Sequence, residues 1–209
     1  MYARTTTFHG HPKSLDAGIA YVREQVLPVV REMEGCVGLA MLVDRSTGRC
    51  IVTTSWADEE ALSRSGAFVG SLREAAAQIL VGADGDAQVA SWTVGVLHRV
   101  RPAPATAACR VIWTKGPIGR TERIVDTVRT VMVPRLDDLA GFCSMSVLVD
   151  EATGRCALAC VYEDRQTMNR AKGQARAIRD EFAEHAGMQV TEVAEFDLVL
   201  AHLRVPETV

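Results

Sequence analysis

The chain carries the same sequence pattern twice, and this repeat constrains its fold more than any other feature. Leu42–Cys50 (LVDRSTGRC) recurs as Leu148–Cys156 (LVDEATGRC), 106 residues later. When Arg4–Arg99 is laid on Arg110–Val205 at that spacing without gaps, 18 of the 96 positions are identical. Unrelated sequences of average composition would give about six. A repeat of this length indicates a duplicated domain.

The repeat also sets the expected domain boundaries. We predict one domain at 1–100 and a second at 108–209, joined at 101–107 by a short, stiff linker that contains two prolines. A two-residue deletion near Met188 improves the match of the two tails. It aligns Trp92 with Phe196 and His98 with His202.

Within each half, the spacing of apolar residues changes in the same order. A strand precedes a helix whose apolar residues step by three or four. Proline interrupts this helix at the same point in both copies, at Pro28 and Pro134, which predicts a kink. Two strands joined by an Asp-x-x-Thr-Gly-Arg turn follow, then a second helix capped by Asp58 or Asp164, then a last strand. Each half is therefore predicted to be a ferredoxin-like β-α-β-β-α-β unit.

A ferredoxin-like unit of this size covers one face of its sheet with helices and leaves the other face uncovered. Two units that lay these faces together would bury them. The covalent link raises the effective concentration of the partner face to the order of millimolar. The predicted fold class is α+β, with two tandem ferredoxin-like units forming an intramolecular dimeric α/β barrel. This is a pseudo-dimer within one chain, and a further homodimer is left open.

Charge and hydropathy exclude several classes of partner. The chain has 23 Lys and Arg against 26 Asp and Glu, a net charge of −3 without a basic block, so nucleic acid is a poor partner. No apolar run reaches the roughly 18–20 residues that span a bilayer, and the start lacks a secretory signal, so we expect a cytoplasmic protein without a membrane partner. The six cysteines include no CxxC pair and are expected to be reduced and buried. A redox or metal role for Cys156 and Cys160 is the alternative.

Three segments of the first half carry a family resemblance, and the second copy keeps parts of them more loosely. They are Gly35–Leu39, Thr47–Arg49 and Thr54–Leu62, with Gly141, Thr153–Arg155 and Tyr162–Asp164 in the second copy. In these segments the chain resembles the antibiotic biosynthesis monooxygenase (ABM) family, which belongs to the dimeric α/β-barrel superfamily. The resemblance covers both halves and rests on turns, caps and helix starts.

The resemblance implies a range of activities. Members include cofactor-independent monooxygenases that oxidise polycyclic phenols to quinones, haem-degrading enzymes, and small-molecule isomerases or decarboxylases. The first class needs an apolar cavity, a general base and donors that stabilise an oxyanion, with no cofactor and no metal. Haem degradation fits poorly, because the histidine and tryptophan that haem-degrading relatives carry on the second helix are missing from Leu62–Ala77.

The last strand of each half carries a candidate catalytic base. Strand alternation places His98 and His202 on the apolar face, with Trp92 and Phe196 respectively, and imidazole titrates near neutral pH. Each histidine is interpreted either as a base that faces the cavity or as a capping, partly exposed side chain at the strand end.

Candidate substrate-binding residues are two arginines and three aromatic side chains. Arg64 and Arg170, on the second helix of each half, are candidates to hold a phenolate or carboxylate, with a surface ion pair as the alternative. The candidates to stack on an aromatic ligand are Trp92, Phe196 and Trp113, with core packing as the alternative. If a pocket persists, we expect one half to keep it open and Trp113 to plug the other.

Three functions remain open on the sequence. The first is a cofactor-independent monooxygenase acting on a planar aromatic or polyketide-like small molecule. The second is a non-catalytic protein that binds an apolar or aromatic small molecule. The third is a structural or stress-related barrel whose pocket has filled in.

Overall fold

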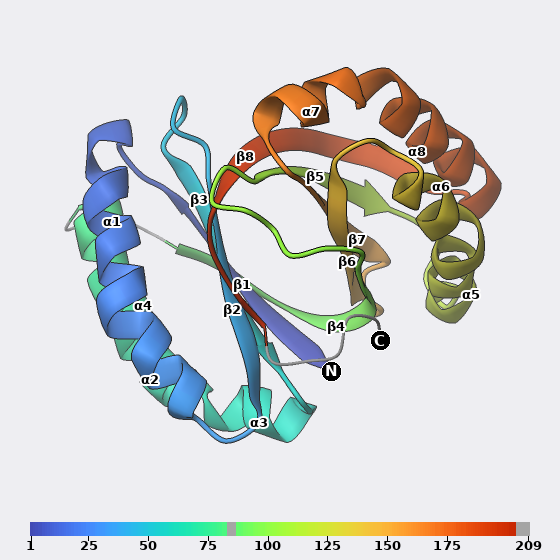
Figure 1. The fold of residues 1–209 in the computed structure, drawn as a ribbon. Coiled ribbons are helices and arrows are strands. Elements are labelled where there is room, and N and C mark those ends of the chain that lie inside the picture. Colours follow the sequence, from blue (N-terminus) through green and yellow to red (C-terminus); the bar gives the residue numbers. More distant parts are fainter. Residues whose placement is uncertain (83–86, 204–209) are drawn as a thin grey trace. The chain divides into compact units, whose positions relative to one another are not determined.

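The computed structural model describes residues 1–82 and 87–203 and has an α+β fold (Figure 1). The chain forms two compact units. The first holds Met1–Trp92 together with the end of the last strand from Asp197, and the second holds Thr93–Phe196.

The first unit contains three complete strands and the helices that cover them. The strands are β1 (Tyr2–His9), β2 (Cys36–Val43) and β3 (Arg49–Trp56). The helices are η1 (Pro12–Ser14), α1 (Leu15–Tyr21), η2 (Val22–Val26), α2 (Leu27–Glu32), α3 (Glu59–Arg64) and α4 (Gly66–Leu80).

The second unit repeats this order. Its complete strands are β5 (Ala108–Lys115), β6 (Phe142–Asp150) and β7 (Arg155–Tyr162). Its helices are α5 (Thr121–Thr127), η3 (Val128–Met132), α6 (Val133–Asp137), α7 (Arg165–Arg170) and α8 (Lys172–Ala186). The long strands β4 (Ala87–Arg99) and β8 (Gln189–Leu203) each contribute residues to both units.

The strand pairing confirms the predicted fold class. In the first unit, β3 pairs antiparallel with β1 and β2, and the end of β8 pairs with β2. In the second unit, β7 pairs antiparallel with β5 and β6, and the second half of β4 pairs with β6. The hydrogen-bonded order is β1-β3-β2-β8-β5-β7-β6-β4, a closed barrel.

The division into units does not fall at the ends of the sequence repeat. It falls inside β4, between Trp92 and Thr93, because Trp92 bonds Thr5 of the first unit while Thr93–Arg99 pairs with β6 of the second. The boundaries 1–100, 101–107 and 108–209 describe the duplicated sequence and stay a prediction.

Each unit has its own apolar core between its sheet and its helices. In the first unit, Trp56 and Phe8 are fully buried in a cluster with Leu15, Val22 and Val30. In the second unit, the cluster includes Tyr162 and Phe142, which meet edge to face with ring centroids 6.0 Å apart.

The interrupted helix contains a π-helical turn before each proline. In the first unit the N–H of Leu27 donates to the carbonyl of Val22, and in the second the N–H of Val133 donates to the carbonyl of Val128. Both bonds span five residues instead of four, and Pro28 and Pro134 follow directly. A widened turn is one recognised way in which a helix accommodates an interior proline, which has no N–H to donate.

The predicted caps are present, but the second helix is broken in two. The Asp58 carboxylate accepts from the N–H of Ala61 at 2.8 Å, and the Asp164 carboxylate accepts from the N–H of Thr167 at 2.6 Å. A single helix was expected in each half; instead, α3 ends at Arg64 and α7 ends at Arg170 before α4 and α8 begin. The break leaves backbone carbonyls of the short helices available to side chains from the sheet.

Candidate functional site

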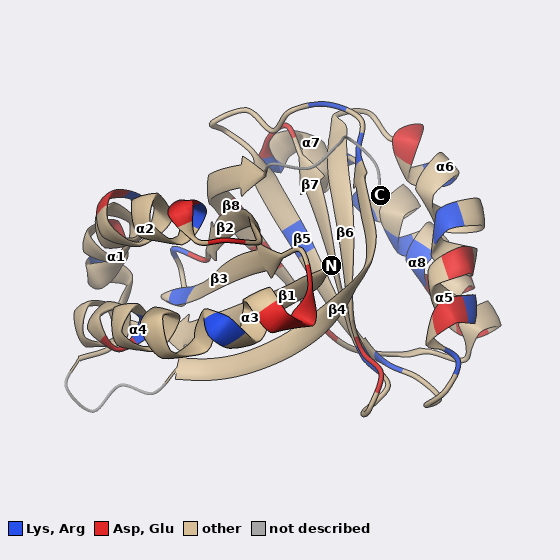
Figure 2. Cartoon of the chain, turned by 90° about the horizontal axis from the view of Figure 1, so that it is seen from below, with Lys and Arg blue, Asp and Glu red and all other residues tan. Residues whose placement is uncertain are grey.

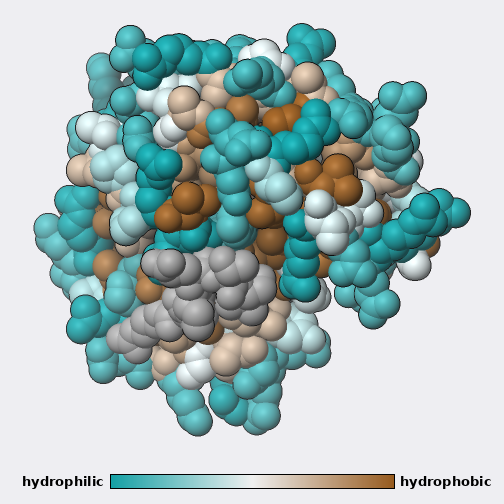
Figure 3. Space-filling model, turned by 45° about the vertical axis from the view of Figure 1, so that its right-hand side comes forward, coloured by the Kyte–Doolittle hydropathy of each residue, from teal (hydrophilic) through white to brown (hydrophobic). Residues whose placement is uncertain are grey.

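The second unit contains a pocket of about 280 Å³ on the helix-covered face of its sheet. Its walls come from β5, β7 and β8 below and from η3, α6 and α8 above. On the side of the molecule that carries α5, α6 and α8, hydrophobic side chains lie among hydrophilic ones (Figure 3). The lining residues are Arg110, Ile112, Met132, Leu136, Cys160, Tyr162, Lys172, Ala175, Arg176, Arg179, Val193 and Glu195.

Arg110 of β5 is the most buried charge of this pocket, with 5% of its surface exposed. Its Nη2 donates to the carbonyl of Met168 in α7 at 3.2 Å, a group that the break between α7 and α8 leaves accessible. Its guanidinium also lies 6.0 Å from the ring centroid of Tyr162. Arg110 thereby joins the sheet to the helix layer at the floor of the pocket.

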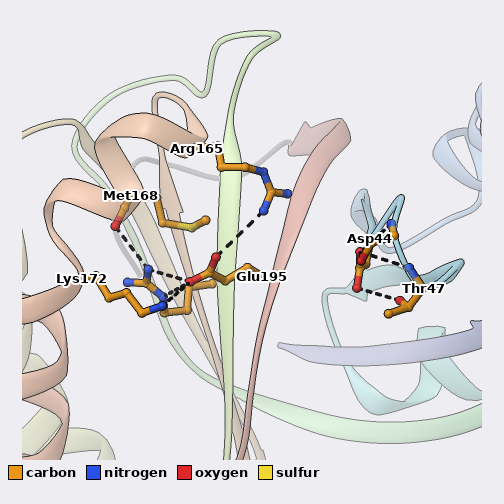
Figure 4. A network of polar contacts seen from close by, with 8 residues as sticks. Asp44, Thr47, Arg165, Met168, Lys172 and Glu195 are labelled. Carbon is orange, nitrogen blue, oxygen red and sulfur yellow. Dashed lines mark hydrogen bonds and ion pairs between the residues drawn. The ribbon is translucent and has the colours of Figure 1, made fainter.

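Glu195 of β8 forms an ion pair with Arg110 and longer ion pairs with two further cations. Its Oε1 accepts from Arg110 Nη2 at 2.9 Å and from Arg110 Nε at 3.2 Å. It also forms longer ion pairs with Lys172 at 3.9 Å and Arg165 at 4.0 Å (Figure 4). Charge-assisted contacts of this kind fix the carboxylate in one orientation.

The helix above the pocket adds positive charge. Basic residues recur along α8 (Figure 2), and three of them, Lys172, Arg176 and Arg179, line the pocket. Arg179 donates two hydrogen bonds to Asp180, and Arg176 pairs with the same carboxylate at 3.4 Å. The lining therefore holds four cationic side chains and one carboxylate, which favours an anionic group in the ligand.

Two polar side chains at the pocket wall stay neutral at physiological pH. Burial raises the pKa of the Cys160 thiol to about 12 and raises the pKa of Tyr162 well above its ordinary value. Because a thiolate, not a thiol, is the nucleophile, Cys160 is unsuited to covalent chemistry. Around them, Ile112, Met132 and Leu136 form an apolar wall. The arrangement can hold an apolar or aromatic body and a negative charge.

His98 lies on the helix-covered face and not with Trp92, because β4 contains a bulge. Its register against β6 shifts between Val94 and Val96, which reverses the alternation of side chains beyond that point. The Nε2 atom of His98 lies 2.8 Å from the Asp137 carboxylate at the end of α6. His98 does not line the pocket, and its role as a base stays a prediction.

His202 occupies the corresponding place in the first unit. It pairs with Leu39 on β2, after a register shift in the β2–β8 ladder. Its Nε2 atom is buried and has no hydrogen-bond partner among the described residues. The residue that matches Asp137 in the repeat is Arg31, which forms an ion pair with Glu32 at 3.3 Å. The catalytic role of His202 also stays a prediction.

None of the three aromatic candidates lines the pocket. Trp92 donates from Nε1 to the Thr5 hydroxyl at 2.8 Å in the first unit. In the second unit, Trp113 and Phe196 meet edge to face with centroids 6.4 Å apart. They neighbour pocket residues Ile112 and Glu195 along their strands and therefore point to the opposite face of the sheet. The pocket is thus not the one that Trp113 was expected to plug.

The two arginine candidates take part in local contacts. Arg64 is exposed and pairs with Glu60 one turn earlier at 2.6 Å, and Arg170 donates to the Thr167 hydroxyl at 3.1 Å. Neither contact involves the pocket lining, and the substrate-binding roles of both arginines stay predictions.

The site residues predicted from the sequence did not include Arg110, Glu195, Lys172 or Arg176. A signal for Arg110 was present, because Arg4 and Arg110 are identical in the repeat. What the repeat did not reveal is the break in the second helix, which brings Arg110 to the Met168 carbonyl.

Two kinds of feature are absent from residues 1–82 and 87–203. In these ranges, no three His, Cys, Asp or Glu side chains gather as metal ligands would. Nor does any helix in them have the length and apolar character needed to cross a membrane.

Comparison with known proteins identifies the family. The model of the antibiotic biosynthesis monooxygenase family matches residues 1–66. Two uncharacterised proteins of Mycobacterium tuberculosis are 40% and 35% identical to the chain; the matches span 100% of this chain and 88% and 92% of theirs, respectively. The chain belongs to the antibiotic biosynthesis monooxygenase family, as the sequence resemblance predicted.

Solved structures show the same fold at low sequence identity. A candidate monooxygenase from Lactobacillus acidophilus superposes with a TM-score of 0.71 at 13% identity, covering 97% of this chain and 96% of that one. An anthrone oxidase-like protein gives a TM-score of 0.65 at 12% identity, covering 99% of this chain and 94% of that one.

Proposed function

We propose that the chain is a cofactor-independent monooxygenase whose second unit binds a planar aromatic, polyketide-like small molecule in its phenolate or enolate form. The observation that carries the proposal is the composition of the pocket: an apolar wall beneath Lys172, Arg176 and Arg179. The family and the likeness to an anthrone oxidase-like fold support the reaction class.

We call Lys172, Arg176 and Arg179 the cationic rim of the pocket. This rim has a chemical role in the proposed reaction. A substrate that reduces O₂ without a cofactor must first lose a proton to become an electron-rich anion. Positive charge near the substrate oxygen stabilises that anion and lowers the pKa of the bound substrate. Arg179 has 16% of its side chain exposed, and of the three rim cations it has the most sheltered position from which to do this.

The reaction balances without a further reductant. An anthrone that reacts with O₂ gives an anthraquinone and water. The ring methylene loses both hydrogens and becomes a carbonyl; one oxygen atom enters that carbonyl and the other leaves in the water. The protein's contribution is to bind, orient and deprotonate the substrate.

A non-catalytic binding protein is the second candidate, and one observation favours it. Glu195, the carboxylate among the lining residues, is held by Arg110 and faces Lys172 and Arg165, an arrangement that disfavours its action as a base. The pocket then binds an aromatic anion without transforming it.

Oxygen uptake with an anthrone, without added metal or cofactor, separates the two candidates. The monooxygenase predicts enzyme-dependent O₂ consumption and anthraquinone formation, both absent under anaerobic conditions. Arg179→Gln is expected to lower kcat/KM at least tenfold, whereas Arg31→Gln, an exposed arginine of the first unit, leaves it unchanged. Saturable binding without turnover supports the binder, and absence of both binding and turnover contradicts the proposal.

The predicted histidine bases are tested in the same assay. If His98 or His202 acts as the base, His98→Ala or His202→Ala removes oxygen-dependent turnover while binding persists. Unchanged turnover in both variants would mean that neither histidine removes the proton. The positive charge of the cationic rim alone would then promote formation of the substrate anion.

A further inference from the structure

The first unit has an arginine pair that matches Arg110 and Arg179 of the second. Arg4 and Arg73 stand at the equivalent positions of the repeat. Arg4 donates to the carbonyl of Leu62 at 2.8 Å, the same helix-end contact that Arg110 makes with Met168, and to the Ser65 hydroxyl at 2.9 Å. Within the described residues, neither Arg4 nor Arg73 forms an ion pair with a carboxylate.

Both guanidinium groups lie against one face of α4 that carries two glycines. A Cβ built on Gly66 would lie 3.7 Å from Arg4 Nη2, and one built on Gly70 would lie 3.8 Å from Arg73 Nη2. Gly66 and Gly70 are four residues apart, so they lie on one side of the helix, roughly 5–6 Å from each other. We call this side the glycine face.

The glycine face has few neighbouring atoms besides these guanidinium groups. Within 4 Å of each built Cβ, no heavy atom of the described residues lies beyond the one guanidinium nitrogen, apart from the helix itself. The second unit has Lys172 and Arg176 at the matching positions. Where α8 carries two long cationic side chains, α4 has only glycine, with the guanidinium groups of Arg4 and Arg73 beside it.

The two arginines also lack the counter-charges of their equivalents. Arg110 has Glu195 and Arg179 has Asp180. The residue that matches Glu195 is Ser91, and Glu74, which matches Asp180, forms no ion pair with Arg73. Burial and the nearby charge of Arg73 together lower the pKa of Arg4 from its ordinary value. Two like charges held together without a counter-ion are unfavourable, and an anion between them would relieve this repulsion.

We infer that the first unit binds a compact oxyanion, a carboxylate or phosphate group, between Arg4 and Arg73 on the glycine face of α4. The Arg4 guanidinium is anchored by Leu62 and Ser65, so it is pre-organised to donate its remaining N–H groups. Arg73 supplies the second cation. This site is separate from the aromatic pocket of the second unit and does not depend on it.

Calorimetric titration of the full chain with sodium phosphate and with sodium acetate, at an ionic strength held constant with sodium chloride, tests the site. We expect saturable binding that Arg73→Gln weakens at least tenfold. Arg23→Gln, which removes an exposed arginine of the same unit, is expected to bind as the wild type does. The stronger of the two probes identifies the oxyanion as phosphate-like or carboxylate-like.

A second variant guards against a loss of binding caused by damage to the fold. Ser91→Glu places in the first unit the carboxylate that the second unit already has, so it should remove binding and leave the circular dichroism spectrum unchanged. Binding that persists in Arg73→Gln, or a wild-type chain that binds neither probe, overturns the inference. Binding lost in Arg179→Gln but kept in Arg73→Gln also overturns it, and places the anion in the pocket of the second unit.

Discussion

Arg110 and Arg4 make the same structural contact in two different electrostatic settings. Each reaches from the first strand of its repeat to a carbonyl at the end of a short helix, Met168 or Leu62. Arg110 then meets the carboxylate of Glu195, whereas Arg4 meets the hydroxyl of Ser65. The comparison shows that the contact holding helix to sheet was kept after duplication, while the charge around it changed.

The pocket of the second unit also differs from the matching part of the first unit. Tyr162 and Cys160 line the pocket of the second unit. At the matching positions the first unit has Trp56, which is fully buried, and Thr54, whose hydroxyl accepts from the Trp56 indole at 3.1 Å. The first unit thus has a larger, fully buried side chain with a satisfied polar group where the second unit has pocket-lining residues. The duplication has thus produced one unit with a pocket of apolar and cationic lining and one with two arginines beside the glycine face.

The largest expected effect comes from truncating the two arginines. Arg110→Ala removes a buried guanidinium and leaves the partly buried Glu195 carboxylate without its main partner, so it should lower the free energy of unfolding by about 3–5 kcal/mol. Arg4→Ala loses hydrogen bonds but leaves no carboxylate without its partner, so it should lower the free energy of unfolding by about 1–3 kcal/mol. Urea denaturation followed by circular dichroism measures both. Equal losses would contradict the difference in setting.

A smaller effect is expected from removing one positive charge from the cationic rim of the pocket. Arg176 is 72% exposed, so Arg176→Gln should weaken binding of an anionic aromatic ligand by about two- to fivefold, with a smaller difference at high salt. Fluorescence titration at two ionic strengths measures this. Arg123→Gln, on the exposed side of α5, is the matched control and should bind as the wild type does.

The hairpin turns give a pH-dependent comparison. The Thr153 hydroxyl, with further bonds from Arg155, holds the pKa of Asp150 below its ordinary value of 3.8. In Asp44, burial works to raise the pKa, but hydrogen bonds from Ser46 and Thr47 outweigh it and the pKa is again lowered. A lowered pKa means stability that is present above the ordinary value and lost as pH falls through the lowered one.

Asp150→Asn and Asp44→Asn should therefore each flatten the loss of stability below about pH 4. The effect should be larger for Asp150→Asn, because Arg155 adds a charge-assisted bond of 2.9 Å. Melting temperatures between pH 2.5 and 7 measure it. Parallel curves for wild type and both variants would show that these turns do not contribute to acid unfolding.

The smallest expected effect concerns the two histidines. Asp137→Asn removes the acidic partner of His98, which is partly exposed, and should lower the free energy of unfolding by less than about 1 kcal/mol. His202 has Arg31 at the matching position, so Arg31→Asn should leave stability nearly unchanged. Thermal melts of both variants measure this difference. A larger loss of stability in Arg31→Asn than in Asp137→Asn would contradict the prediction.

Much of the fold could be predicted from the sequence because duplication makes local signals appear twice. Pro28 with Pro134 marked the interrupted helix, and Asp58 with Asp164 marked the caps, and the structure has both. These features depend on a few neighbouring residues. A pattern within the sequence is therefore sufficient to find them.

The candidate site was harder to predict because it depends on register. Strand alternation placed His98 with Trp92, but the bulge after Val94 turns His98 to the other face. A bulge adds one residue and leaves little trace in hydropathy. Similarly, Glu195 beside Phe196 has the pattern of a solvent-facing residue, and only the contact with Arg110 makes it part of a pocket.

The strands β4 and β8 each begin in one unit and end in the other. A fragment that ends near residue 100 would lack Asp197–Leu203, which pair with β2, and the remaining fragment would lack Thr93–Arg99, which pair with β6. Each fragment would therefore leave backbone groups of an outer strand unpaired. Each half of the duplicated sequence thus supplies one strand segment to the unit built mainly from the other half. Either half can change its surface chemistry as long as these exchanged segments keep their pairing.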